Sequence, residues 1–210
     1  MFFGDHQRKA ARQLIHLALA EDLNLGGDET SMALIPADQV GSVQIVAREP
    51  GVLAGLPAAW LVFDEIDHGI SFRPLAEDGD SLAAGQVVAE LAGKVRSLLA
   101  GERTSLNFLT HLSGVATLTR RYVESVAGTK AKIYDTRKTL PGWRALQKYA
   151  VLAGGGYNHR QGLFDMVLIK DNHLAAWRAL ATDRSIAAAI RVAEERSSAG
   201  IVIEVEVDTL

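Results

Sequence analysis

Hydrophobic and polar positions follow two different rhythms in the first half of this chain. Apolar side chains fall at helical spacing over residues 7–22 and again over residues 102–126, so both stretches predict amphipathic helices. Between them, residues 40–101 contain short β-type runs separated by Gly, Pro and Asp turns, with one helical stretch at residues 57–66. The polar residues 24–31 predict a turn that ends the first helix. The first half is therefore expected to mix helices with short strands.

The second half alternates strands with helices. Apolar runs predict strands at residues 131–134, 166–169 and 201–207, and helical patterns predict helices at residues 142–153 and 186–196. Alternating units of this kind, with near-continuous apolar strands, are typical of a parallel sheet or barrel. A closed barrel needs about eight strands. We therefore expect an incomplete barrel, in a chain that is either a fragment or carries an unpaired strand edge.

Polar residues follow these three strands directly. Asp135–Lys138 follow the first strand, Lys170–His173 follow the second, and Glu204, Glu206 and Asp208 lie on and after the third. In parallel α/β barrels the reacting groups lie at the C-terminal ends of several strands. The functional side chains are therefore expected at these three ends.

Positive charge is concentrated in residues 130–170. That segment holds eight Lys and Arg residues against two Asp, a net charge of +6, whereas the whole chain carries -3, which leaves -9 for the rest. A cleft lined by one sign of charge concentrates ligands of the other sign. The segment is therefore interpreted as a site for small polyanions. A sequence pI near 6.1 argues against a broad nucleic-acid-binding face.

Individual residues in this segment suit anion recognition. Arg137 and Lys138 precede the rigid turn Thr139–Gly142, which would hold them in place. A guanidinium donates two parallel hydrogen bonds to a carboxylate or phosphate. His159, next to Arg160, is a candidate donor to a carboxylate.

Carboxylates are the second candidate chemistry. Glu204 and Glu206 alternate on the last strand and therefore share one face of it. This arrangement suggests Mg²⁺ held through oxygen and water, or contacts to sugar hydroxyls. The alternative is an edge strand with a solvated face. Glycines 154–156 also keep two interpretations, a helix stop or a close approach of residues 158–160 to a ligand.

Several classes of protein are excluded or disfavoured. The chain has no cysteine, which excludes disulfide frameworks and thiolate metal sites. Its start lacks the basic and then apolar pattern of a signal peptide, and no run of about 18 apolar residues exists. A cytoplasmic protein with neither a membrane nor a nucleic-acid partner is the expectation.

Six motifs together resemble those of the quinolinate phosphoribosyltransferase family. They are Glu102–Phe108, Leu112–Thr117, Asp135–Gly142, Lys148–Val151, Gly154–Arg160 and Ile169–His173, in the family's order. The resemblance extends from about residue 19 to the last residue. It implies an α/β fold, with an N-terminal α/β sandwich domain at residues 1–108 and an incomplete C-terminal open α/β barrel domain at residues 109–210.

The resemblance also implies an activity. A phosphoribosyl group passes from phosphoribosyl pyrophosphate to the nitrogen of quinolinate, and pyrophosphate and CO₂ leave, giving nicotinate mononucleotide in NAD biosynthesis. The implied substrate-binding residues are Arg103, Thr136, Arg137, Lys138, His159, Arg160 and Lys170. Lys138, Lys170 and Glu206 are implied to act in catalysis, with Glu206 also at a Mg²⁺ cofactor. Arg103 is implied to reach the neighbouring site of a homodimer.

The family's pattern continues beyond residue 210, with a second acidic residue and glycine-rich phosphate loops. This chain is therefore expected to bind quinolinate better than phosphoribosyl pyrophosphate and to turn over weakly or not at all. One alternative is the molybdenum-transport-associated paralogue, which the complete motifs at residues 158–160 and 169–173 disfavour. The other is a non-catalytic, truncated remnant of the same fold that serves only dimerisation.

Overall fold

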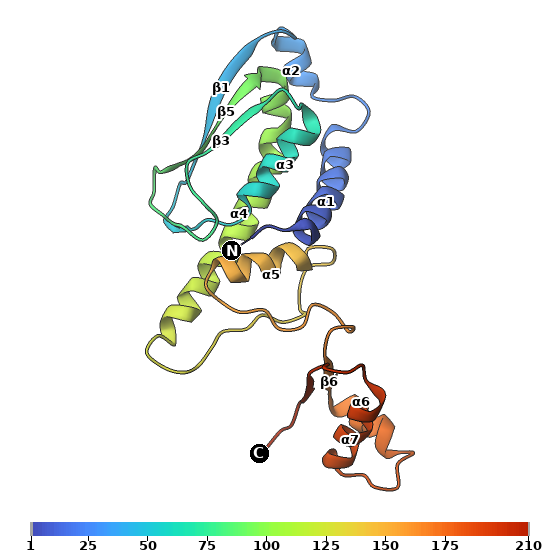
Figure 1. The fold of residues 1–210 in the computed structure, drawn as a ribbon. Coiled ribbons are helices and arrows are strands. Elements are labelled where there is room, and N and C mark those ends of the chain that lie inside the picture. The colour runs from blue at the N-terminus through green and yellow to red at the C-terminus, as the bar shows by residue number, and fades with distance from the viewer. Residues whose placement is uncertain (1, 210) are drawn as a thin grey trace. The chain divides into compact units, whose positions relative to one another are not determined.

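The structure, a computed structural model, describes residues 2–209 of the chain (Figure 1). Contacts divide the chain into two compact units, residues 1–159 and residues 160–210. No helix among the described residues is long and apolar enough to cross a membrane.

An antiparallel sheet forms one layer of the first unit. Its strands are β1 (Val40–Val46), β5 (Val87–Lys94) and β3 (Ser71–Pro74), in the order β1-β5-β3. A second, small antiparallel pair joins β2 (Gly51–Val52) to β4 (Ser81–Leu82). All of these strands come from the stretch in which β-type runs were expected.

Helices form the other layers of the first unit. They are α1 (Asp5–Leu23), α2 (Glu29–Leu34), α3 (Leu56–Ile66), α4 (Val95–Ser125) and α5 (Arg144–Ala153). Figure 1 shows α3 and α4 against one face of the sheet, with α1 on the far side of α3. This layering of a sheet and helices is an α/β sandwich.

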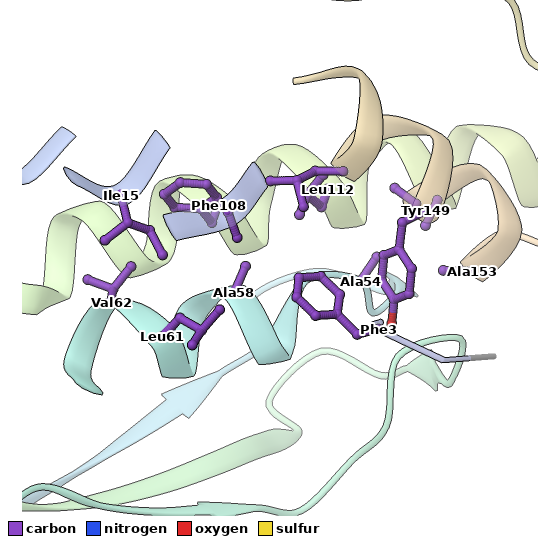
Figure 2. Packing of buried hydrophobic residues seen from close by; sticks show 14 of the residues in the cluster. Phe3, Ile15, Ala54, Ala58, Leu61, Val62, Phe108, Leu112, Tyr149 and Ala153 are labelled. Atoms are coloured by element: carbon purple, nitrogen blue, oxygen red, sulfur yellow. The ribbon is translucent and has the colours of Figure 1, made fainter. Parts of the chain in front are cut away.

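Two apolar clusters hold these layers together, and α3 contributes to both. Leu61 and Val62 join the cluster formed with α1, α4 and α5 (Figure 2). Leu56, Ala59 and Phe63 join the cluster formed with the sheet. Because α3 is apolar on both sides, it lies between two layers and buries both faces.

Helix α4 begins seven residues before the predicted start at residue 102. Gly101 lies inside it, although a glycine within a helix costs about 1 kcal/mol relative to alanine. A Cβ at Gly101 would come within 2.7 Å of the Phe63 ring on α3. This glycine therefore permits close helix packing and does not stop the helix. Residues 108 and 109, where we predicted the domain boundary, lie in the middle of α4, and that boundary stays a prediction.

The second unit pairs β6 (Val167–Ile169) with β7 (Ile203–Val205) in parallel. Helices α6 (Asp171–Arg178) and α7 (Ile186–Arg196) lie between them in the chain. The unit's buried core is small and is formed by Ile169, Leu174 and Ala189. The predicted bounds of α7 are confirmed, and β7 is shorter than the strand expected at residues 201–207.

Other expectations were wrong. Residues 131–134 do not form a strand, because their pairing is limited to one parallel bridge between Tyr134 and Tyr157. The backbone bonds at this bridge are Tyr157 N–H to Ile133 O, 2.8 Å, and Asp135 N–H to Tyr157 O, 3.0 Å. Helices α2 and α6 were missed because six and eight residues are too short for a clear helical period. The α/β fold class is confirmed.

Candidate functional site

The loop at residues 135–143 carries the first group of candidate residues. Thr136 and Lys138 are exposed, and Arg137 is half-buried. The Thr136 hydroxyl accepts a hydrogen bond from the Lys138 backbone N–H at 3.0 Å, which closes a short turn around Arg137. The Arg137 Nε–H is buried and has no hydrogen-bond partner within the described part of the chain. Because an unpaired buried donor is unfavourable, a carboxylate or phosphate bound here would relieve that cost.

A tight turn and helix α5 hold this loop in shape. Gly142 adopts φ +80° after Pro141, and the Trp143 N–H donates to the Leu140 carbonyl oxygen at 3.1 Å. Proline followed by a glycine with positive φ is the signature of a type II turn. Gln147 Oε1 on α5 accepts a further bond from the Leu140 N–H at 3.0 Å. The rigid turn predicted from the sequence is therefore present.

Gln147 also links the loop to helix α4. Its Nε2 lies 2.9 Å from His111 Nε2, and burial lowers the pKa of His111. The neutral ring therefore accepts this bond from the amide. The His111 ring meets Trp143 edge-on, with ring centroids 4.9 Å apart. Helix α4 also carries Arg103, whose side chain is exposed and makes no hydrogen bond or ion pair with any other described residue.

His159 is partly buried at the end of the first unit. Its backbone N–H donates to Asp135 Oδ1 at 2.8 Å, and its carbonyl oxygen accepts from Lys148 Nζ at 3.0 Å. Lys148 also forms an ion pair with Asp135, and its side chain is 1% exposed. The backbone of His159 is therefore held by two buried charged groups.

Glycines 154–156 allow close packing of helix α5 against α4. A Cβ at Gly154 would lie 2.4 Å from the carbonyl oxygen of Ala116, and the Arg120 Nε–H donates to the Gly154 carbonyl oxygen at 3.0 Å. Gly155 adopts φ +90°, which ends the helix. These contacts favour the helix-stop interpretation of the glycines.

In the second unit, the ends of β6 and β7 bring a candidate cation and carboxylate together. Lys170 follows β6 and Glu206 follows β7, and Lys170 Nζ donates to Glu206 Oε2 at 2.5 Å. The Glu206 N–H continues the ladder to the Ile169 carbonyl oxygen at 2.9 Å. Both side chains keep substantial exposure, 42% for Lys170 and 58% for Glu206. Parallel pairing therefore places this pair at one accessible edge.

Two further residues of the second unit have local structural contacts. Arg160 is buried, and its Nη1 donates to the Met166 carbonyl oxygen at 3.3 Å. His173 lies in the first turn of α6, where its Nδ1 accepts from the Lys170 N–H at 3.0 Å. His173 therefore caps α6.

The candidate residues are thus distributed over both units. Arg103, Thr136, Arg137, Lys138 and His159 belong to the first unit, and Arg160, Lys170 and Glu206 belong to the second. Within the first unit the structure brings the loop at residues 135–138 next to His159, and within the second it pairs Lys170 with Glu206. The roles given to these residues stay predictions.

Sequence reasoning missed Asp135 and Lys148 as a pair. Lys148 was predicted to be part of the cationic segment and of a family motif, whereas its ammonium is buried and neutralised by Asp135. A signal was present, because Lys148 lies on the face of α5 that buries Ala145 and Tyr149. A charged residue on a buried helix face usually has a specific partner.

Comparison with known proteins defines the class of this fold. Residues 28–113 match the family model described as "Quinolinate phosphoribosyl transferase, N-terminal domain", and residues 115–210 match the one described as "Quinolinate phosphoribosyl transferase, C-terminal domain". The chain has the fold of a solved structure of NadC from Streptococcus pyogenes, with a TM-score of 0.87 and 41% identity, covering 94% of this chain and 68% of that one. A nicotinate-nucleotide pyrophosphorylase from Francisella tularensis gives a TM-score of 0.86 at 40% identity, covering 96% of this chain and 68% of that one.

Curated relatives narrow the class to one family. The nicotinate-nucleotide pyrophosphorylase [carboxylating] of Mycobacterium leprae is 50% identical over 209 residues, which cover 99% of this chain and 71% of that protein. The probable nicotinate-nucleotide pyrophosphorylase [carboxylating] of Synechocystis is 42% identical over 192 residues, which cover 91% of this chain and 62% of that protein. The chain belongs to the quinolinate phosphoribosyltransferase family. It spans about two thirds of the length of these relatives.

Proposed function

We propose that this chain transfers a phosphoribosyl group from phosphoribosyl pyrophosphate to quinolinate, with decarboxylation, as a pentosyltransferase of NAD biosynthesis. The observation that carries the proposal is the loop at residues 135–143, in which a rigid turn fixes Arg137 with a buried, unpaired Nε–H. One relative, from Mycobacterium leprae, is named nicotinate-nucleotide pyrophosphorylase [carboxylating], and another, from Nicotiana tabacum, is named quinolinate phosphoribosyltransferase [decarboxylating] 1b. The ligand class expected from the cationic segment, a small polyanion, agrees with both substrates.

Recognition of quinolinate is assigned to Arg137, His159 and Arg160, which hold its two carboxylates. Arg137 is suited to this because it is the residue with a buried guanidinium donor left unbonded. Charge-assisted hydrogen bonds of this kind are about twice as strong as neutral ones. Thr136 orients the loop through its bond to the Lys138 N–H. Lys138 adds an exposed positive charge next to the carboxylate-binding residues.

Phosphoribosyl transfer exchanges one bond at ribose C1′ for another and leaves negative charge on pyrophosphate. The ring nitrogen of quinolinate forms a bond to ribose C1′ while the bond from C1′ to pyrophosphate breaks, and the departing oxygen keeps the electron pair. Lys138 and Lys170 offset the charge that develops on the leaving group, and preorganised donors of this type contribute about 3–4 kcal/mol each. The carboxylate next to the ring nitrogen then leaves as CO₂, its bonding electrons pass to the pyridinium ring, and a proton takes its place.

In the second unit, Glu206 is the residue proposed to bind Mg²⁺. Mg²⁺ is usually bound by one or two carboxylates together with water and substrate phosphates, so it needs no all-protein cage. Glu206 offers an exposed carboxylate beside Lys170, and no group of three or more His, Cys, Asp or Glu residues suited to a metal occurs within residues 2–209. When bound, the ion would supply positive charge to the pyrophosphate oxygens.

A homodimer completes the proposal. The first unit has an open, largely apolar groove of about 1440 Å³ between β1 and α4, and its lining includes Val43, Leu99 and Leu106. An open apolar groove of this kind is a candidate contact surface for a second subunit. Arg103 lies exposed on the same helix, and we assign it to the substrate site of the neighbouring subunit. The cytoplasmic location expected from the sequence stays a prediction.

The test of the activity is mass-spectrometric detection of nicotinate mononucleotide after incubation with quinolinate, phosphoribosyl pyrophosphate and Mg²⁺. Calorimetric titration with quinolinate accompanies it. Arg137→Ala should weaken quinolinate binding roughly 10- to 100-fold, the equivalent of one lost charged hydrogen bond. Arg8→Ala, an exposed arginine on α1, is the matched control and should bind like the wild type. Absence of product from the folded wild type would refute the proposed activity, and absence of quinolinate binding would refute the role of Arg137 as well.

The shared site is tested by mixing two variants that are each inactive, Arg103→Ala and His159→Ala. If one site takes Arg103 from one subunit and His159 from the other, half of the randomly mixed dimers carry one intact site. About a quarter of the wild-type activity then returns. No recovery in a mixture shown to exchange subunits would refute the sharing of Arg103.

A further inference from the structure

A buried ion pair lies directly behind the loop that carries Arg137. The Lys148 ammonium on α5 and the Asp135 carboxylate are ion-paired, and their side chains are 1% and 7% exposed. Removing charged groups from water is costly, and such a pair adds little or no stability over apolar residues of similar volume. Folding alone therefore does not account for placing two charges here.

The pair forms hydrogen bonds to a third segment of the chain, residues 158 and 159. Asp135 Oδ1 accepts the His159 N–H at 2.8 Å, and Lys148 Nζ donates to the His159 carbonyl oxygen at 3.0 Å. In the amide orientation that satisfies its surroundings, Asn158 Nδ2 donates to Asp135 Oδ2 at 2.7 Å and to the Lys148 carbonyl oxygen at 2.9 Å. We call Asp135, Lys148, Asn158 and the His159 backbone the buried tether.

The buried tether touches the chain immediately beside two sets of candidate residues. Asp135 precedes Thr136 and Arg137, and its backbone N–H is itself bonded to the Tyr157 carbonyl oxygen at 3.0 Å. The ion pair holds both the N–H and the carbonyl oxygen of His159. The spacing between the Arg137 loop and His159 is therefore set by side chains, because the backbone pairing nearby is a single bridge.

The tether's own charges cancel, so it adds no net charge at the ligand. Its effect is geometric. A bound dicarboxylate needs donors at a fixed separation, and a misplacement of about 1 Å at such a site costs roughly 100-fold in function. The need for a fixed separation between donors explains why two buried charges are present, although apolar residues would give similar stability.

We propose that the Asp135–Lys148 ion pair is a positioning device that sets the distance between the Arg137 loop and His159 for recognition of a pyridine dicarboxylate. The inference rests on the proposed function, since quinolinate is the ligand that the two loops share. Lys148 and Asp135 are positioning residues and do not contact the substrate. A tether of this kind predicts that ligand affinity falls when the pair is broken, even in variants that remain folded.

The experiment compares wild type, Lys148→Met and Tyr149→Phe by quinolinate titration at a temperature where circular dichroism shows all three folded. Tyr149→Phe is the matched control, because it removes a buried hydrogen bond from the next residue of the same helix without touching the tether. If Lys148→Met does not fold, the double variant Asp135→Asn, Lys148→Met takes its place, because the double variant leaves no unpaired buried charge. Selective ¹⁵N-histidine labelling reports the His159 amide in each protein.

The expected result is a loss of about 100-fold in quinolinate affinity with a displaced His159 amide resonance in Lys148→Met or the double variant, and neither effect in Tyr149→Phe. Wild-type affinity in a folded tether variant would overturn the positioning role and leave the proposed function standing. An equal loss in Tyr149→Phe would also overturn it, because the effect would then follow stability alone. A folded wild type that does not bind quinolinate would refute the proposed function, and the positioning role with it.

Discussion

Removal of one oxygen atom at residue 149 tests how the layers of the first unit are joined. The Tyr149 hydroxyl on α5 donates to Asp78 Oδ2 at 2.7 Å, and the ring is 3% exposed, so the bond is shielded from water. Asp78 also accepts the N–H groups of Gly55 and Leu56 at the start of α3, at 2.9 and 3.0 Å. Tyr149 therefore connects α5 to the N-terminus of α3 through one carboxylate.

The expected cost of Tyr149→Phe follows from that geometry. A buried hydrogen bond to a charged group contributes about 1.5–3 kcal/mol. The ring contact with Phe3, with centroids 5.0 Å apart and planes at 90°, survives the substitution. Asp78 keeps its two backbone donors, so no carboxylate is left unpaired. We expect the free energy of unfolding at neutral pH to fall by about 1.5–3 kcal/mol in urea titrations followed by circular dichroism.

The same bond has a signature in alkaline solution. Burial raises the pKa of Tyr149 well above its usual value, and the nearby negative charge of Asp78 raises it further. The folded chain keeps this proton while the unfolded chain releases it above about pH 10. The contribution of Tyr149 to stability is therefore complete below pH 10 and is lost as the pH rises beyond it, by about 1.4 kcal/mol per pH unit.

Tyr149→Phe should lack this alkaline loss, so the difference in stability between wild type and variant should shrink from about pH 10 upward. Tyr122→Phe is the control, because Tyr122 is 56% exposed on α4 and should leave the curve unchanged. Equal stability of wild type and Tyr149→Phe at neutral pH would refute a stabilising hydrogen bond between Tyr149 and Asp78. Plots of stability against pH that run parallel for the two proteins between about pH 9 and pH 11 would refute it as well.

Three further substitutions, one of them a control, test the contacts on which the loop and α5 depend. Gly154→Ala should destabilise the fold by about 1–3 kcal/mol, because the added methyl group would overpack against the Ala116 carbonyl oxygen. Gly114→Ala is the control: this glycine is exposed on α4 with open space around it, and the substitution should stabilise the fold by about 0.5–1 kcal/mol. Thermal unfolding measures both effects, and a similar change in the two variants would contradict the packing argument. Burial lowers the pKa of His111 in the folded chain. The contribution of His111 to stability is therefore complete above the pKa of an unfolded histidine, about 6.5, and is lost as the pH falls below that value. His111→Gln should remove this part of the loss of stability at acid pH. Identical acid unfolding curves for wild type and His111→Gln would contradict that role.

The sequence by itself determined the class of the fold and most of its elements. Helices α1, α3, α5 and α7 were expected within two residues of their observed bounds, because each has an apolar stripe long enough to show its period. The turn at Pro141–Gly142 was expected for a local reason, since proline fixes one backbone angle and glycine permits the positive φ of the next position. The cationic segment and the pattern of the last strand also drew attention to Arg137, Lys170 and Glu206 before any geometry was considered.

Only the tertiary structure decided what depends on distant parts of the chain. Residues 131–134 have a strand-like pattern but make a single bridge, because strand formation requires a partner segment that the pattern does not specify. The predicted helix started after Gly101, whereas this glycine lies inside α4 and packs against Phe63 of α3. Lys148 looked like one cation among eight until burial against Asp135 removed its charge from the surface. A sequence pattern reports local preference, whereas the partner of a buried charge is set by the packing of separate segments.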